Sequence, residues 1–259
     1  MSVNVAEIIK IMEEIAPPSL AEEWDNVGLM LGRRSSTVKK LLLALDITAE
    51  VVRQAVAQKA DMIITHHPLI FKGMKAVTDR DWQQELMLTL AEHGIAVYSA
   101  HTNLDCVSNG VNDVLAKKLR LEDIDVLDAE TGLGRIGTVA ECSIDEFAVL
   151  VKTALKADYV VIGSAGRKVN TVAVCGGAGS DLISLALLRG ADTLVTGDIK
   201  YHEAQKAVFS GLNVIDAGHQ ATELHVMDSL ADRLSQRFAQ RDMHVVVNVA
   251  SETLLLKHI

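Results

Sequence analysis

The fold is decided by residues 60–68, which read ADMIITHHP and lead a short apolar segment directly into two histidines. The segment is apolar and β-branched as far as Ile64, which predicts a buried strand. Pro68 has no backbone N–H to give to a sheet, so we expect strand pairing to stop there. Adjacent side chains at the end of a strand can diverge towards two points in one cleft. His66 and His67 are therefore candidate ligands for a pair of metal ions.

The second half of the sequence repeats this unit. Residues 191–196, ADTLVT, match residues 60–65, ADMIIT, at an offset of 131 positions. Apolar segments at 171–174 and 182–188 match segments of the first half at the same offset, and residues 211–215 echo another one with slightly different spacing. Because the matches follow in the same order, we predict a duplicated α/β unit.

Strands that alternate with helices favour parallel or mixed sheets. We therefore expect an α/β fold of two similar, intertwined halves with mixed sheets, divided as residues 1–125 and 126–259, with the functional site between them.

Composition narrows the class of protein. The chain has 259 residues and is 49% hydrophobic, with a mean hydropathy of +0.22, which predicts buried subunit interfaces as well as a core. No apolar run approaches the roughly 20 residues that span a bilayer. The formal net charge of −9 argues against binding nucleic acid over a broad surface. The first residues resemble no secretory signal and the three cysteines are unclustered, so we expect a cytoplasmic protein.

Two further histidines are each followed by a carboxylate four residues later, His101 by Asp105 and His219 by Glu223. Within one helical turn this spacing places both side chains on the same face, where they can reach one metal centre. At the positions equivalent to His66 and His67 the second half has Gly197 and Asp198, and so no histidine. Neither half holds the full set of ligands alone, so a complete site needs both halves.

We predict two divalent metal ions per chain, bridged by a carboxylate and a water. Glu223 is the better bridge, because its longer side chain can reach both ions. His101 is left open as a sixth ligand or a proton shuttle. Imidazole and carboxylate ligands together suit Zn²⁺, Fe²⁺, Mn²⁺ or Ni²⁺ without choosing among them. The predicted metal ligands are His66, His67, Asp105, His219 and Glu223.

Four motifs resemble the Nif-three-like family, also called GTP cyclohydrolase 1 type 2 homologues. They are EEWDNVGL at 22–29, THHP at 65–68, GDIKYH at 197–202 and AGHQATE at 217–223. The resemblance covers nearly the whole chain. It implies two intertwined α/β halves without an inserted domain, a dinuclear metal centre held by the same five residues, and a toroidal homohexamer.

Together these features predict a metal-dependent hydrolase. It would act on a small nucleotide-like or phosphorylated substrate through a metal-bridging hydroxide. The alternative is a non-catalytic, metal-binding oligomeric scaffold or regulator. A ring that associates with DNA is the least favoured reading, because the chain is acidic.

Three other features stay open between two readings each. The loop at 175–180, CGGAGS, is either an anion cradle or a tight strand–helix turn. The side chains at 198–202 either contact substrate or begin a surface helix. Trp24 and Trp82 are expected in the core or in an interface.

Overall fold

The computed structural model describes residues 3–256. By contacts the chain forms two compact units: unit 1 holds the described residues up to Leu104 together with Met227–Thr253, and unit 2 holds Asp105–Val226 and the described residues from Leu254. The C-terminal helix and strand thus belong with the first part of the sequence. The division of the repeat after residue 125 stays a prediction.

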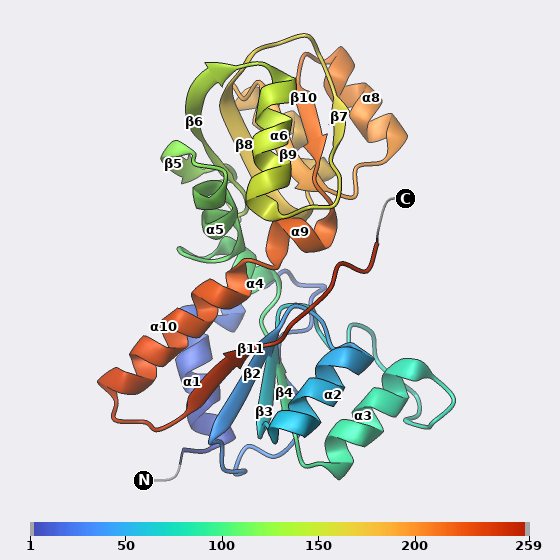
Figure 1. Ribbon diagram of the computed structural model, residues 1–259, viewed down its shortest axis with the longest axis vertical. Helices are drawn as coiled ribbons and strands as arrows, with labels where there is room; N and C mark the ends of the chain where they lie inside the picture. Colours follow the sequence, from blue (N-terminus) through green and yellow to red (C-terminus); the bar gives the residue numbers. More distant parts are fainter. Residues whose placement is uncertain (1–2, 257–259) are drawn as a thin grey trace. The chain divides into compact units, whose positions relative to one another are not determined.

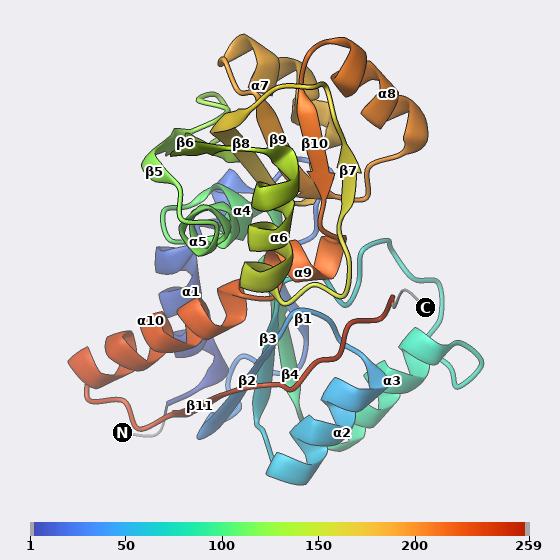
Figure 2. The ribbon, with the colours of Figure 1, turned by 45° about the horizontal axis from the view of Figure 1, so that its top comes forward.

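Unit 1 is a five-stranded sheet between two layers of helices. The strand order is β1-β4-β3-β2-β11, and only β1 runs antiparallel to its neighbour. Helices α2 and α3 lie on one face of the sheet and α1 and α10 on the other (Figures 1 and 2). The strands are β1 (Gly28–Leu31), β2 (Lys40–Ala44), β3 (Met62–Thr65), β4 (Ala96–Ser99) and β11 (Val246–Val249); the helices are α1 (Val5–Ile15), α2 (Ala49–Gln58), α3 (Trp82–Glu92) and α10 (Val226–Gln240), with a 3₁₀ turn at Pro18–Leu20.

Unit 2 is a six-stranded sheet in the order β5-β6-β8-β9-β10-β7, in which β8, β9 and β10 are parallel. Helices α5 and α6 pack on one face, and α7 and α8 on the other. The strands are β5 (Glu122–Val126), β6 (Arg135–Cys142), β7 (Val161–Gly163), β8 (Val169–Ala178), β9 (Thr193–Gly197) and β10 (Asn213–Asp216); the helices are α5 (Val111–Lys118), α6 (Ile144–Leu155), α7 (Ile183–Leu188), α8 (Tyr201–Phe209) and α9 (His219–Glu223), with a 3₁₀ turn at Ser180–Leu182. The chain passes from unit 1 to unit 2 within α4 (Thr102–Cys106).

The two sheets share a core of three parallel strands and one antiparallel strand, which confirms the predicted duplication, and they differ in the strands beyond β2 and β8. In unit 1, Leu41 of β2 pairs with Met62 of β3. In unit 2, Val172 of β8 pairs with Thr193 of β9, each 131 positions further on. Each unit also places a fourth strand antiparallel beside its third parallel strand, β1 beside β4 and β7 beside β10.

A pair of equivalent carboxylates repeats the same hydrogen bonds. Asp61 Oδ2 accepts from the backbone N–H groups of Lys39 and Lys40 at 2.7 and 2.9 Å. Asp192 Oδ2 accepts from the two backbone N–H groups at the corresponding positions, 170 and 171, at 2.9 and 2.7 Å. Each carboxylate thereby joins the starts of two parallel strands, which explains why the repeat keeps an aspartate there.

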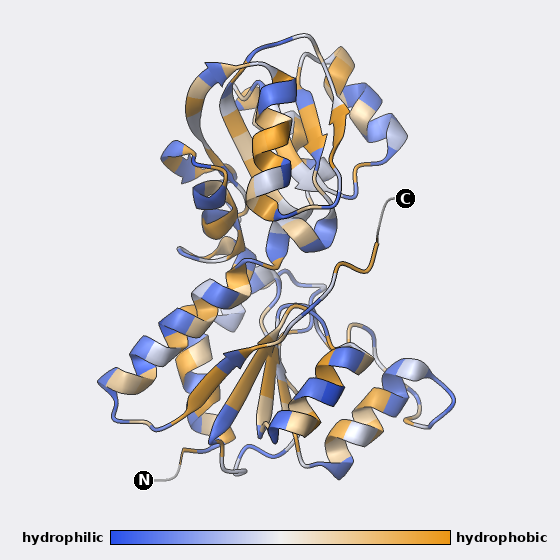
Figure 3. Ribbon diagram, in the orientation of Figure 1, coloured by the Kyte–Doolittle hydropathy of each residue, from blue (hydrophilic) through white to orange (hydrophobic). Residues whose placement is uncertain are grey.

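Hydropathy explains where the elements lie. The central strands of both units are apolar, whereas the helices alternate between apolar and polar faces (Figure 3). Such amphipathic helices cover a sheet with one face and meet solvent with the other. Among the described residues, no helix is both long and apolar enough to cross a bilayer.

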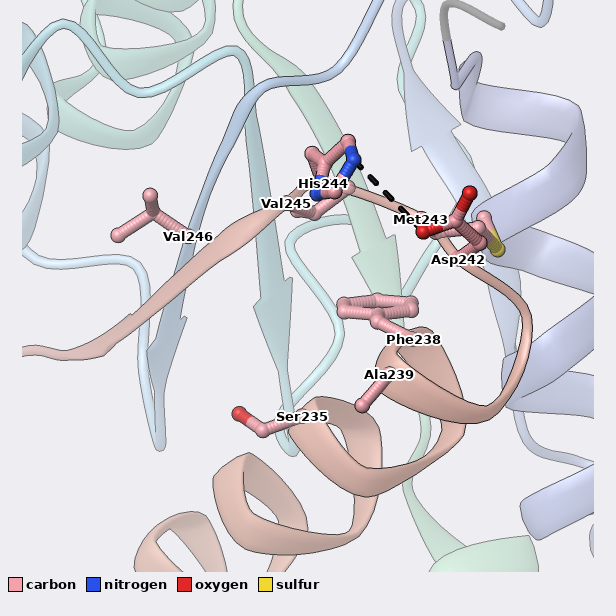
Figure 4. Close-up of a pocket in the computed structure, with 8 residues that line it drawn as sticks. All are labelled: Ser235, Phe238, Ala239, Asp242, Met243, His244, Val245 and Val246. Carbon is pink, nitrogen blue, oxygen red and sulfur yellow. Dashed lines mark ion pairs between the residues drawn. The ribbon is translucent and has the colours of Figure 1, made fainter.

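A pocket in unit 1 lies between the end of α10 and β11, against the side chain of Phe238 (Figure 4). His244 Nε2 faces Asp242 Oδ1 at 3.8 Å at its rim. None of the predicted metal ligands lines this pocket.

Candidate metal centre

Three histidines gather at one edge of the unit 1 sheet. His66 and His67 follow β3, and His101 follows the neighbouring parallel strand β4. Because parallel strands end at the same edge of a sheet, the three side chains converge there. Their ring centroids are 5.0 to 5.7 Å apart, and one ligand atom from each lies within 4.8 Å of the others. The cluster therefore has the dimensions of a site that could hold a metal ion.

Each of these imidazoles directs Nδ1 at an oxygen. His66 Nδ1 faces the carbonyl of Ala100 at 3.0 Å, and His67 Nδ1 faces Asp46 Oδ1 at 2.8 Å. His101 Nδ1 faces Asp25 Oδ1 at 2.9 Å. A carbonyl or ionised carboxylate oxygen only accepts hydrogen bonds, so Nδ1 carries the proton and Nε2 carries the lone pair. This is the tautomer that binds a metal through Nε2.

Asp25 also fastens the start of α4. Its Oδ2 accepts from the backbone N–H of Thr102 at 3.1 Å and from the Thr102 hydroxyl at 2.5 Å. Burial alone would raise the pKa of Asp25, but hydrogen bonds from the Thr102 hydroxyl and the His101 ring hold it below its usual value. Burial, followed by the charge of His66, lowers the pKa of His101. Both shifts favour a neutral imidazole beside an ionised carboxylate.

Glu252 supports the other orienting carboxylate. Its two carboxylate oxygens accept from the backbone N–H groups of Leu45 and Asp46 at 2.7 and 3.2 Å. Burial raises the pKa of Glu252 above its usual value. Through the Asp46 backbone, Glu252 holds the carboxylate that orients His67. Nothing in the sequence pattern indicates this role, because Glu252 lies beyond the last strand.

His219 and Glu223 lie one turn apart on α9 of unit 2. The spacing of four residues brings His219 Nε2 to 3.3 Å from Glu223 Oε2, which confirms the predicted pairing. His219 Nδ1 faces Asp198 Oδ2 at 2.8 Å. Asp198 therefore orients the imidazole in the same way as Asp25 and Asp46 do in unit 1. Both open readings of residues 198–202 missed this role.

His101 and Asp105 are not placed on a helix in the same way as His219 and Glu223. Helix α4 begins at Thr102, so His101 lies before it and directs its ring at Asp25. Asp105 lies on α4 and is buried. The two His–acid pairs have the same sequence spacing but different backbone geometry, because α9 begins at His219 itself.

Buried polar side chains fix the backbone around Asp105. Asn112 Nδ2 donates to the Asp105 carbonyl at 3.1 Å, and Asn112 Oδ1 accepts from the Gly176 N–H at 2.9 Å. Arg135, itself buried, forms an ion pair with Asp113 and donates to the Cys106 carbonyl at 3.3 Å. Sequence analysis missed Asn112 and Arg135, because neither belongs to a ligand-like pattern.

The loop at 175–180 is the tight turn and not the anion cradle. The N–H of Gly177 donates to Thr222 Oγ1 at 3.0 Å, and the N–H of Gly179 donates to Thr196 Oγ1 at 2.8 Å. The N–H of Gly176 donates to Asn112 Oδ1. With these donors already satisfied, the loop has no nest of N–H groups left for an anion. Burial, reinforced by the carboxylates of Asp105 and Glu223, raises the pKa of the Cys175 thiol, which stays protonated.

Gly177 leaves space for the two candidate metal ligands on α9, His219 and Glu223. A Cβ at this position would lie 3.1 Å from His219 Nε2 and would overlap Glu223 Oε1. We expect Gly177→Ala to displace both side chains and to weaken metal binding by at least about ten-fold, a loss comparable to that of an orienting group.

The control for Gly177→Ala is Gly190→Ala. Both glycines have positive φ, +65° and +82°, so alanine carries a similar backbone cost at each, but nothing lies within 4 Å of a Cβ at Gly190. Isothermal titration with Zn²⁺ compares the two variants. Equal affinities would show that Gly177 matters only for the backbone.

Both tryptophans are exposed, which excludes the core as their location. Trp24 is 60% exposed and Trp82 is 70% exposed. A place in an interface stays a prediction for both.

Comparison with known proteins agrees with this architecture. A family model described as Duf34/NIF3 (NGG1p interacting factor 3) matches residues 3–253. A "GTP cyclohydrolase 1 type 2 homolog" of Lactococcus lactis is 38% identical over 220 residues, 83% of this chain and 86% of the relative. A protein of the same name from Clostridium perfringens is 35% identical and covers 93% of this chain and 95% of its own length.

A solved structure shows the same fold. The crystal structure of a Staphylococcus aureus hypothetical protein superposes with a TM-score of 0.94 at 30% identity, over 100% of both chains. With a family match across nearly the whole sequence, the chain belongs to the Duf34/NIF3 family.

Proposed function

We propose that His66, His67, Asp105, His219 and Glu223 bind two divalent metal ions, Zn²⁺, Fe²⁺, Mn²⁺ or Ni²⁺. One observation carries this proposal. Four imidazoles, His66, His67, His101 and His219, direct Nδ1 at an oxygen acceptor. Ligating histidines show this arrangement because the acceptor fixes the tautomer and aims Nε2 at the metal. It is supported by Gly177, which leaves space beside His219 and Glu223.

We propose further that the chain is a metal-dependent hydrolase for a nucleotide-like or phosphorylated small molecule. The name of its relatives, GTP cyclohydrolase 1 type 2 homolog, favours a nucleotide. Bound divalent ions lower the pKa of water and polarise a substrate oxygen. His101 serves as a further ligand or as the proton carrier. Its Nδ1–H is held by Asp25, so Nε2 is the atom that would accept a proton.

Turnover tests this proposal. Protein loaded with Zn²⁺ or Mn²⁺ is assayed against GTP, other nucleotides and phosphomonoesters. We expect activity that disappears on chelation and in His66→Ala. Activity that survives in His66→Ala contradicts the hydrolase. Loss of thermal stability on chelation, with no turnover of any substrate, supports the scaffold instead.

We also propose that the chain forms a homo-oligomer, with a hexamer as the expected state. Support comes from unit 2, where Val161 on β7 and Tyr201 and Phe209 on α8 expose large apolar side chains around one pocket. Exposed apolar patches on folded proteins mark association surfaces. Sedimentation equilibrium measures the assembly mass.

A further inference from the structure

Two large aromatic rings in unit 1 are exposed side by side. Trp24 is 60% exposed and Phe71 is 46% exposed. Their ring centroids lie 5.9 Å apart with an interplanar angle of 60°. Only 3% of the chain is aromatic, so two neighbouring rings left open to solvent need an explanation. Together they form a surface that we call the aromatic corner.

The aromatic corner borders the histidine cluster. The His101 ring centroid lies 6.1 Å from that of Trp24 and 6.3 Å from that of Phe71, with interplanar angles of 77° and 81°. Both rings therefore meet His101 edge to face, at normal aromatic packing distances. A molecule resting on the aromatic corner would be adjacent to the candidate metal ligands.

Polar contacts hold the aromatic corner in place. Asp25, next to Trp24, accepts hydrogen bonds from His101 and Thr102. Asn26 Nδ2 donates to the Ile70 carbonyl at 2.5 Å, which ties the Trp24 turn to the residue preceding Phe71. The rings are thus exposed on a backbone fastened on both sides. Such preorganisation lowers the entropy cost of binding.

The geometry selects one kind of contact. A ring sandwiched between Trp24 and Phe71 would need their planes about 7 Å apart, and the 5.9 Å centroid distance is too short. A flat ring can instead stack on the open face of one side chain and touch the other with its edge. Lys72 and Lys75 follow Phe71 in the same loop and are exposed. Their charge suits an anionic group attached to that ring.

We propose that the aromatic corner binds the flat heteroaromatic ring of an anionic substrate, such as the base of a nucleotide. Its link to turnover rests on the proposed hydrolase function, but ring binding itself can be measured separately. The Trp24-Asp25-Asn26 motif then has one role for each residue: Trp24 contacts the ring, Asp25 orients His101, and Asn26 joins the two aromatic segments.

Fluorescence of Trp24 tests the proposal. Trp24 and Trp82 are the only tryptophans, so Trp82→Phe leaves Trp24 as the sole reporter. The Zn²⁺-loaded variant is titrated with guanosine monophosphate and with ribose 5-phosphate, which keeps the sugar and phosphate but lacks the ring. We expect saturable quenching by the nucleotide and none by ribose 5-phosphate. Equilibrium dialysis of the unmodified chain confirms the affinity.

Phe71→Leu removes the aromatic face but keeps an apolar side chain, and we expect it to weaken nucleotide binding about ten-fold. The control is Leu188→Ala, which truncates an exposed apolar side chain on α7 of unit 2, outside the proposed association surface, and is expected to leave binding unchanged. Circular dichroism checks that both variants fold.

Two kinds of result would overturn the proposal, the first from the binding assays and the second from Trp24 emission. One is equal binding of ribose 5-phosphate and the nucleotide, or unchanged binding in Phe71→Leu. The other is Trp24 emission that responds to protein concentration but not to nucleotide, which would make the aromatic corner an interface between copies. Saturable nucleotide binding without turnover removes only the hydrolase, and turnover with an unchanged KM in Phe71→Leu removes only the aromatic corner.

Discussion

The variants His66→Ala and Glu223→Ala are each expected to bind one metal ion per chain or none, instead of two. His66 is buried in unit 1 and Glu223 in unit 2. If both supply ligands to one dinuclear centre, losing either disturbs ions that the other also binds, because a bridged pair shares its ligands. Elemental analysis of protein purified without a His-tag gives ion identity and number.

His93→Ala is the matched control for these substitutions. His93 is exposed at the end of α3 and its Nδ1 faces the Thr89 carbonyl of its own helix at 2.8 Å. This variant should retain the full metal content. Wild-type metal content in Glu223→Ala would remove Glu223 from the ligand set. If each variant lost a different ion and the double variant lost both, the two units would bind separate ions.

The variants Asp46→Asn and Asp198→Asn are each expected to lower metal affinity by about ten- to hundred-fold. The number of ions bound at saturation should stay unchanged. Each carboxylate accepts from the Nδ1–H of a candidate ligand, Asp46 from His67 and Asp198 from His219. The amide has the same shape but no charge, so the imidazole becomes a weaker donor to the metal and loses its fixed tautomer. Competition with a chelator of known affinity measures the change.

Asp61→Asn controls for the loss of an aspartate that supports only the backbone. Asp61 directly precedes β3 and accepts from the backbone N–H groups of Lys39 and Lys40 at the start of β2. It therefore lies at the opposite end of β3 from His66. We expect it to change thermal stability without changing metal affinity. An equal loss of affinity in Asp61→Asn and Asp46→Asn would mean that general destabilisation, and not imidazole orientation, explains the effect.

The local and repeated features of the molecule could be predicted from its sequence. The apolar run before His66 and His67 predicts a buried strand, and Pro68 predicts that strand pairing ends there. Strands β8 and β9 begin pairing in the same register as β2 and β3, with each of these partners 131 positions further along the sequence. His219 and Glu223 could be paired because one helical turn fixes their separation.

The groups that orient the histidines could not be found in this way. Asp25 lies 76 positions from His101, and Glu252 lies 206 positions from the Asp46 N–H that it binds. Only the folded chain brings such groups together, and a single carboxylate in a loop has no periodic signal. The position of His101 before its helix could not be predicted for a related reason. Its spacing from Asp105 matches that of His219 from Glu223, but the sequence does not show that α4 begins only at Thr102.

The edge position of β11 has a consequence for synthesis on the ribosome. The strands of unit 2 all lie between residues 122 and 216, so they leave the ribosome before β11. Until Val246–Val249 emerge, the β2 edge that they cover lacks its partner strand. Glu252 emerges later still, and only then does it bind the backbone of Asp46. The six strands of unit 2 can therefore pair before unit 1 has its edge strand, and the final orientation of His67 must wait for Glu252.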